Sequence, residues 1–117
     1  MSKQINNKYK IPLHVKNYCK QELYDYKKNK LMIESITKNK SQNEIITRAL
    51  LIATQRINQI EKVLNSLCQE EKEIVEVIFF KKSSQAHAEL YYYISKDAYY
   101  NMKNKMLYLT AIEFQLV

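Results

Sequence analysis

A run of polar side chains with the spacing of one helix face lies between residues 96 and 104. Asparagine amides can hydrogen-bond the edge of adenine, and lysine and tyrosine can bind phosphates. An ordinary solvated helix face would have the same pattern, but the turn predicted just before residue 96 favours contact with DNA. Together with two residues ahead of that turn, the candidate DNA-binding residues are Lys82, Ser84, Lys96, Asp97, Tyr100, Asn101, Lys103 and Asn104.

Two elements must position this face. A short helix is expected over residues 85–92, and a longer one runs from Ser95 to about residue 114. The Ser95 hydroxyl can accept a hydrogen bond from a backbone N–H of the next turn and so begin the second helix. Ile94 before it can pack against Tyr99 as a hydrophobic staple. A short helix, a turn and a longer helix with polar outward positions is the order of a helix-turn-helix.

Composition predicts an all-α protein. The 117 residues include no glycine and a single proline, Pro12, so tight β-hairpin turns lack their preferred residues. No apolar run approaches the roughly 18 residues that span a bilayer, and the N-terminus does not resemble a secretion signal. The spacing of Cys19 and Cys68 fits neither a metal site nor a disulfide framework. We therefore expect reduced thiols, a cytoplasmic location, and no cofactor or metal.

The net charge of +7 is unevenly distributed. Residues 1–40 hold ten lysines and three acids, whereas residues 41–80 hold four basic and six acidic groups. Residues 81–117 hold five lysines and three acids. A basic N-terminal segment can bind a polyanion, and lysine-rich composition on solvated helix faces is the alternative. If it binds DNA, we expect Lys3, Lys8, Lys10, Lys16 and Lys20 to act as a mobile basic arm or flank.

The clearest periodic signal is a heptad seam in the second of two long helices. Its apolar residues, spaced alternately by four and three, are Ile46, Leu50, Ala53, Ile57, Ile60, Leu64 and Leu67. Such a seam implies a long partner helix. The partner is either the first helix, residues 13–37, folded back through a loop at 38–43, or the same helix of a second chain. We favour the hairpin because the loop length suits antiparallel neighbours.

A third helix is expected after a capping box formed by Ser66 and Gln69, with acids in its first turn. Residues 74–80 are apolar on nearly all sides, which is typical of a buried core segment. The chain thus divides into a flexible lead (1–12), a helical hairpin with the heptad seam (13–67), and a helix-turn-helix DNA-binding module (68–117).

Three stretches of this last module share a pattern with a known family. They read Leu67-Cys68-Gln69-Glu70-Glu71-Lys72-Glu73-Ile74-Val75, then Phe79-Phe80, then Tyr93-Ile94-Ser95-Lys96-Asp97-Ala98-Tyr99-Tyr100. With these stretches the chain resembles the ArpU/RinA group of phage late-gene transcription regulators. The resemblance is closest over residues 66–112, and residues 15–30 are similar to the N-terminal helix of the group.

The resemblance implies a three-helix module similar to region 4 of bacterial sigma factors, which binds promoter DNA beside RNA polymerase. It implies a phage or prophage transcription regulator whose partners are double-stranded DNA, host RNA polymerase and, in a homodimer, a second copy. The chain departs from the usual helix-turn-helix pattern at three positions, which hold Glu89, Tyr93 and Ala98. A left-handed Tyr93 would lose roughly 1–2 kcal/mol relative to glycine.

Other functions fit the sequence less well. Catalysis is not expected, because His14 and His87 are isolated and no glycine-rich phosphate loop or nucleophile–base grouping occurs. The tyrosine cluster formed by residues 91–93 with Tyr99 and Tyr100 could stack on bases or close a small helical core. The serious alternative function is a helical protein-binding adaptor or inhibitor that keeps a sigma-like fold without reading DNA. The small net charge of residues 81–117 favours that alternative.

Overall fold

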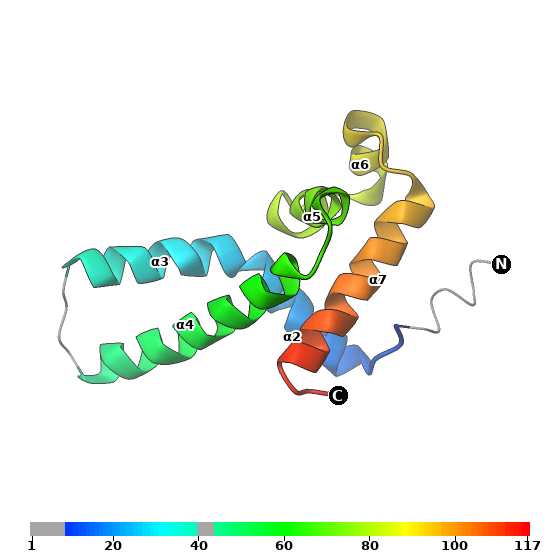
Figure 1. Ribbon diagram of the computed structural model, residues 1–117. Coiled ribbons are helices and arrows are strands. Elements are labelled where there is room, and N and C mark those ends of the chain that lie inside the picture. The colour runs from blue at the N-terminus through cyan, green and yellow to red at the C-terminus, as the bar shows by residue number, and fades with distance from the viewer. Residues whose placement is uncertain (1–8, 40–43) are drawn as a thin grey trace.

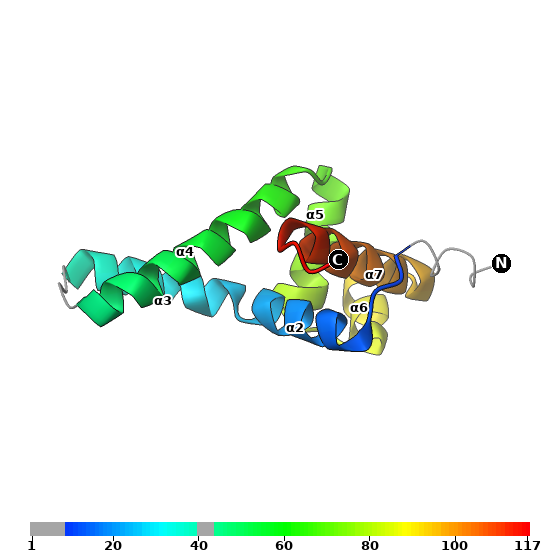
Figure 2. The same cartoon turned by 90° about the horizontal axis from the view of Figure 1, so that it is seen from below.

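The computed structural model describes residues 9–39 and 44–117, which form an all-α fold as the composition predicted. No strand occurs within these two ranges. Figures 1 and 2 show α3 and α4 side by side, projecting from a group formed by the other helices, and the molecule measures 54 × 32 × 23 Å. The elements are α2 (Leu13–Tyr24), α3 (Tyr26–Asn39), α4 (Glu44–Asn65), α5 (Gln69–Val75), the π-helical turn η1 (Glu76–Phe80), α6 (Gln85–Tyr92) and α7 (Lys96–Glu113).

The first long helix is interrupted, which corrects the expectation of one helix over residues 13–37. α2 ends at Tyr24, and α3 begins at Tyr26 after a turn at Asp25 (Figure 2). The backbone N–H of Asp25 still donates to the Gln21 carbonyl at 3.0 Å, so the chain bends without unwinding. α2 packs against α7 and η1, whereas α3 packs against α4. The interruption lets one amphipathic segment bury its two halves against different helices.

The connection between α3 and α4 is shorter than the predicted loop at 38–43, because α3 continues to Asn39. Ser41 and Asn43 of that loop, either of which could cap the second long helix, lie outside the described residues. Residues 1–8 of the expected flexible lead lie outside them as well. The last residues of that lead contact the fold. The ring of Tyr9 lies 5.4 Å from that of Tyr108, and the carbonyl of Pro12 accepts from the Lys16 N–H at 2.9 Å.

Among the described residues of the heptad seam of α4, those that are deeply buried lie in its second half, so burial along the whole seam was a wrong expectation. Ile57, Ile60 and Leu67 are buried, whereas Leu50 and Ala53 are half-buried. Leu64 is half-buried as well, and the side chain of Ile46 lies outside the described residues. α4 packs against both α3 and α7. How deeply a seam residue is buried depends on which helices cover it. The helices other than α3 cover mainly the C-terminal half of α4.

The core is centred on the apolar segment after α5, as its composition predicted. Val75, Ile78 and Phe79 are almost fully buried there, together with Leu23 of α2 and Met106 of α7. The predicted single helix is divided into α5 and η1, in which the widened π-helical turn changes the direction of the side chains. The apolar residues thus face α2, α6 and α7 at once, and these contacts set the position of α7.

The start of α5 differs from the predicted capping box. The carboxylate of Glu71 accepts from the Cys68 backbone N–H at 3.1 Å, whereas the Ser66 hydroxyl donates to the Val63 carbonyl at 2.6 Å. The box therefore lies two residues later than expected. Both cysteines are free thiols; Cys68 is exposed, and burial raises the pKa of the Cys19 thiol to about 11.

Candidate nucleic-acid interface

The turn between α6 and α7 has the local geometry that the sequence predicted. The hydroxyl of Ser95 accepts from the Ala98 backbone N–H at 3.1 Å and begins α7. Tyr93 is left-handed, with φ 58° and ψ 33°, and ends α6. Its N–H and that of Ile94 both donate to the Ala88 carbonyl. Two consecutive N–H groups on one carbonyl fix the direction in which the chain leaves α6.

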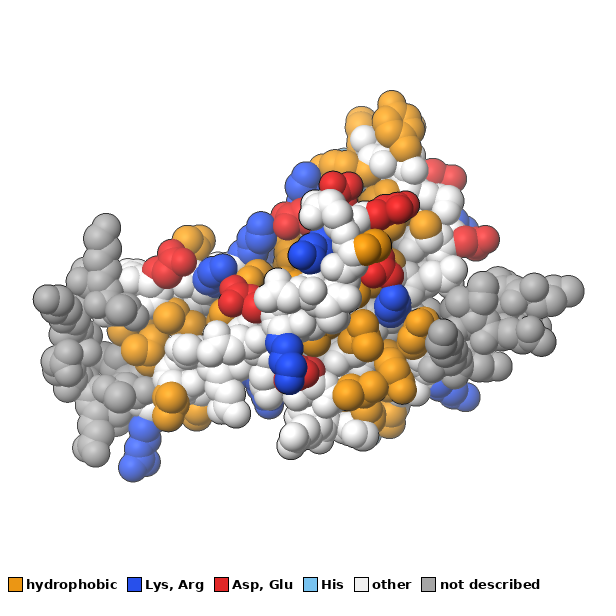
Figure 3. Space-filling model, viewed as in Figure 1, with side chains coloured by type: hydrophobic (Ala, Val, Ile, Leu, Met, Phe, Trp, Pro, Cys, Tyr) orange, Lys and Arg blue, Asp and Glu red, His pale blue; other side chains and the backbone are white. Residues whose placement is uncertain are grey.

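Tyr93 is in an unfavourable conformation with no compensating contact from its ring. A left-handed backbone costs a non-glycine residue roughly 1–2 kcal/mol. The side chain of Tyr93 is 91% exposed, so its burial contributes almost nothing to the stability of the fold. Neighbouring apolar side chains are exposed too, Leu90 at 67% and Tyr91 at 63%. In Figure 3 hydrophobic side chains gather at this tip, over α6.

The loop before α6 connects it to α7 by one direct hydrogen bond. The buried Tyr99 donates its hydroxyl proton to the Ser83 carbonyl at 2.7 Å, and burial raises its pKa, with smaller effects from Tyr24 and Tyr100. The next residue, Ser84, caps α6 by accepting from the His87 N–H at 3.1 Å. The two serines thus place the starts of α6 and α7 relative to each other.

α7 presents a polar face next to a buried one. Tyr99, Met102 and Met106 are buried, whereas Ala98 and Leu109, which share their face of the helix by spacing, are half-buried. Of the predicted contact residues on this helix, Lys96, Asp97 and Tyr100 are exposed, and Asn101, Lys103 and Asn104 are half-buried. The exposed part of this face thus lies in the first turns of α7, beside the loop that holds Ser84.

Lys103 lies at the edge of this face, against α2. Its Nζ is 6.0 Å from the centre of the Tyr99 ring. Burial lowers the pKa of the Lys103 ammonium, and the positive charges of Lys20 and Lys16 lower it further. The sequence had suggested that Lys16 and Lys20 belong to a mobile basic arm or flank. Both are residues of α2, which packs against α7, so they lie on a helical flank of the candidate reading helix and not on a mobile arm.

Lys82 completes a band of positive charge between α2 and the α6–α7 unit. It has a left-handed backbone with φ 54°, and its Nζ lies 5.7 Å from the centre of the Tyr24 ring. We call Lys16, Lys20, Lys82 and Lys103 the basic band. Within the described part of the chain, none of the four forms an ion pair with a carboxylate. Only long-range packing reveals Lys16 and Lys20 as members, because they lie more than 80 residues from Lys103 along the chain.

The tyrosine cluster divides between the two predicted roles. Tyr99 is buried in the core, whereas Tyr91 and Tyr93 point to solvent. The ring of His87 lies 4.6 Å from that of Tyr91, which leaves both on the exposed side of α6. Tyr91 and Tyr93 therefore do not close the core.

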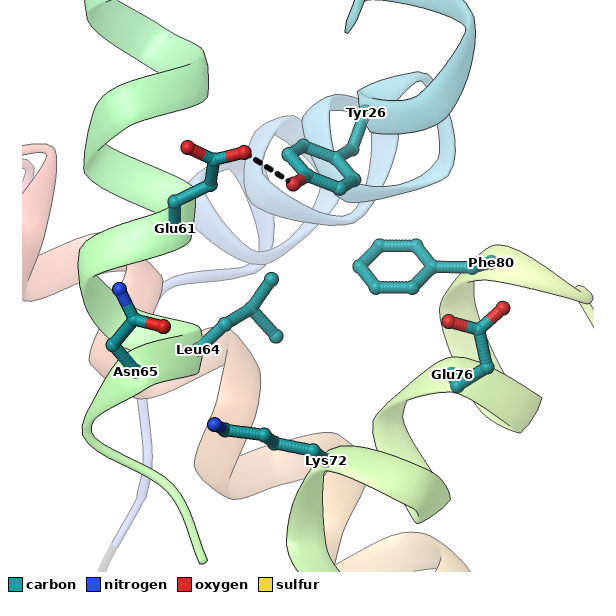
Figure 4. A pocket seen from close by; sticks show the side chains of 7 residues that line it. All are labelled: Tyr26, Glu61, Leu64, Asn65, Lys72, Glu76 and Phe80. Atoms are coloured by element: carbon teal, nitrogen blue, oxygen red, sulfur yellow. Dashed lines mark hydrogen bonds between the residues drawn. The ribbon is translucent and has the colours of Figure 1, made fainter. Parts of the chain in front are cut away.

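A separate groove of about 380 Å³ lies between α3, α4, α5 and η1 (Figure 4). The hydroxyl of Tyr26 donates to the Glu61 carboxylate at 2.8 Å, and Lys30 donates to the same oxygen at 2.8 Å. These hydrogen bonds, that from Lys30 first, lower the pKa of Glu61. The lining comprises Tyr26, Glu61, Leu64, Asn65, Lys72, Glu76 and Phe80. No residue of α6 or α7 contributes, so the groove is distinct from the candidate interface.

Among the residues that the structure describes, no group of His, Cys, Asp and Glu side chains has the arrangement of a metal site. None of their helices is long and apolar enough to cross a membrane. The chain matches no protein-family model, no curated protein and no solved structure.

Proposed function

We propose that the protein is a sequence-specific regulator of transcription that binds double-stranded DNA through a helix-turn-helix formed by α6 and α7. The observation that supports this most is the Ser95-capped start of α7, where a polar face follows a tight left-handed turn. The exposed side chains of Lys96, Asp97 and Tyr100 lie on the first turns of the helix that would enter the major groove.

The proposed contacts follow from side-chain chemistry. Asn101 can hydrogen-bond N6 and N7 of adenine, and Asp97 can accept from N4 of cytosine. Lys96 and Tyr100 can bind phosphates, as can Lys82 and Ser84 from the loop before α6. α7 contains no arginine, so bidentate recognition of guanine by arginine does not occur from this helix.

The module at residues 68–117 would read DNA, and the preceding helices up to residue 67 would support it as a hairpin. By the resemblance to the ArpU/RinA group and to sigma factor region 4, the DNA site would lie at a promoter. The regulator would act with host RNA polymerase in the cytoplasm of a bacterium that carries the phage or prophage. Paired sites and a homodimer would be consistent with this role.

A helical adaptor or inhibitor is the second candidate function. It is supported by the exposed apolar tip of α6, with Leu90, Tyr91 and Tyr93, because such side chains are typical of protein-binding surfaces. Leu31 and Leu51 on α3 and α4 are also more than 60% exposed. In this function the basic band would have no DNA partner.

Selection of duplexes from a random-sequence library, followed by binding at about 50 and 200 mM salt, tests the proposal. A DNA reader should enrich a motif and lose affinity steeply between these concentrations, since bound lysines release counterions from phosphates. A scrambled duplex of equal length should bind more weakly at both. Failure to enrich any motif would contradict sequence-specific recognition and favour the adaptor.

A further inference from the structure

Three lysines of the basic band converge from two helices. Lys16 and Lys20 are one turn apart on α2, each directly after a buried residue, Val15 and Cys19 respectively. They therefore lie on one flank of the face that α2 buries. α2 packs against α7, where Lys103 lies beside them with its ammonium group near the Tyr99 ring. All three are half-buried, so the packing limits the directions in which their stems can point.

These lysines are left unpaired while others of the same molecule have carboxylate partners. Lys27 pairs with Glu76 at 3.1 Å, and Lys105 pairs with Glu71 at 2.6 Å. Lys30 and Lys62 are paired in the same way with Glu61 and Glu113. No such pair is formed by Lys16, Lys20 or Lys103 in the described ranges. An anion bound between the three would relieve their mutual repulsion, which contributes to the lowered pKa of Lys103.

We propose that Lys16, Lys20 and Lys103 form one phosphate-binding site, which takes a backbone phosphate of the DNA beside the groove that α7 enters. This inference rests on the proposed function, because Lys103 lies on the helix that would read the bases. Since the other two lysines belong to α2, the phosphate contact would couple the position of α2 to that of α7. Such a contact carries no sequence information but fixes how the reading helix lies on the duplex.

A charge-matched pair of double variants tests the site. K16Q/K20Q removes two of its charges, whereas K28Q/R48Q removes two charges from exposed positions on α3 and α4. Binding to a selected duplex and to its scrambled counterpart is measured over a salt series. For K16Q/K20Q, we expect the slope of log affinity against log salt to become shallower by about 1–2, with both duplexes weakened alike. K28Q/R48Q should keep the parent slope, and an equal change in both variants would overturn the site.

Acylation of lysines in the parent protein provides a second measurement that does not depend on the folding of a variant. Duplex DNA should protect Lys16, Lys20 and Lys103 from the reagent but leave Lys28 reactive. The same measurement with inorganic phosphate in place of DNA, at the same concentration of phosphate groups, should show little protection. Protection equal to that by DNA would mean a site for free phosphate and would overturn the assignment to the backbone.

The outcomes separate this site from the proposed function. If DNA binding shows no sequence preference but K16Q/K20Q still has a shallower salt slope, the phosphate site stands and sequence-specific reading does not. If the parent shows a sequence preference but the salt slope of K16Q/K20Q equals that of K28Q/R48Q, sequence-specific reading stands and the phosphate site does not. If the parent binds no duplex at all, both proposals fail.

Discussion

The two sides of this molecule use their polar and aromatic residues in different ways. On the arm side, formed by α3 and α4, Lys30 and Tyr26 share the carboxylate of Glu61. The reading side is formed by α6, α7 and the adjoining flank of α2. There Lys16, Lys20 and Lys103 have no carboxylate partner within the described residues. Tyr93 has a left-handed backbone with an exposed ring. Folding alone explains these contacts of Glu61 on the arm side. The reading side keeps features that contribute little to stability, and such features are typical of binding sites.

The largest expected effect is on stability and comes from the arm side. Ile57 is buried in the seam of α4, so Ile57→Ala should lower the free energy of unfolding by roughly 2–5 kcal/mol, since it leaves a cavity. Urea denaturation measures the loss. Leu51→Ala, at a position that is 69% exposed on the same helix, should change the stability by less than about 0.5 kcal/mol. Equal effects of the two substitutions would show that the seam is not buried.

The next largest effect is expected on the reading side, where a substitution should change DNA binding but not stability. Asn101→Ala should reduce discrimination between a selected and a scrambled duplex by about 1–3 kcal/mol, because the proposed amide contact to adenine would be lost. The exposed Asn58 on α4 supplies the matched control, and Asn58→Ala should retain full discrimination. Unchanged discrimination in a folded Asn101→Ala protein would exclude Asn101 from the base contacts.

A third substitution should stabilise the protein. Tyr93→Gly removes the left-handed strain and loses almost no buried surface, so the free energy of unfolding should rise by roughly 1–2 kcal/mol, less the entropy that glycine loses on folding. Thermal denaturation measures the gain. The same replacement at Tyr91, which lies inside α6, should destabilise the protein by about 1 kcal/mol. A loss of stability in Tyr93→Gly would mean that the exposed ring contributes to the fold.

The smallest effect concerns the carboxylate of Glu61. Its pKa is lowered in the folded protein, mainly by the Lys30 hydrogen bond, so the ionised group stabilises the fold above its unfolded pKa of about 4.3. This contribution is lost as the pH falls through the folded pKa. Because the pair is partly exposed, Glu61→Gln should cost only about 0.2–1 kcal/mol at pH 7. The difference from the parent should shrink at pH 3, and a constant difference would contradict the charge-based account.

Local signals predicted the start of α7 and the extent of α6. The hydroxyl of Ser95 begins α7 as its position after Ile94 indicated, and α6 covers residues 85–92 as expected. Such features depend on residues within one or two turns of each other, so the sequence displays them directly. The candidate residues were also placed together in the chain, although three of them are less exposed than their helical spacing suggested.

Long-range packing escaped prediction at several points. Nothing near Asp25 marks the interruption between α2 and α3, which arises because the two helices pack against different neighbours. The π-helical turn at residues 76–80 likewise depends on burial against several helices at once. The seam of α4 predicted a partner helix, but which part of it is deeply buried depends on how far α7 and its neighbours extend along α4.

By itself, the sequence determined the helical class, the capped start of α7 and the polar composition of its outward face. These follow from the absence of glycine, from one serine hydroxyl and from a period of 3.6 residues, all of which act locally. Tertiary structure alone decided that Lys16 and Lys20 of α2 lie beside Lys103 of α7. The physical reason is that burial of Val15, Cys19 and Leu23 against the core fixes the orientation of α2. That orientation determines where its lysines lie.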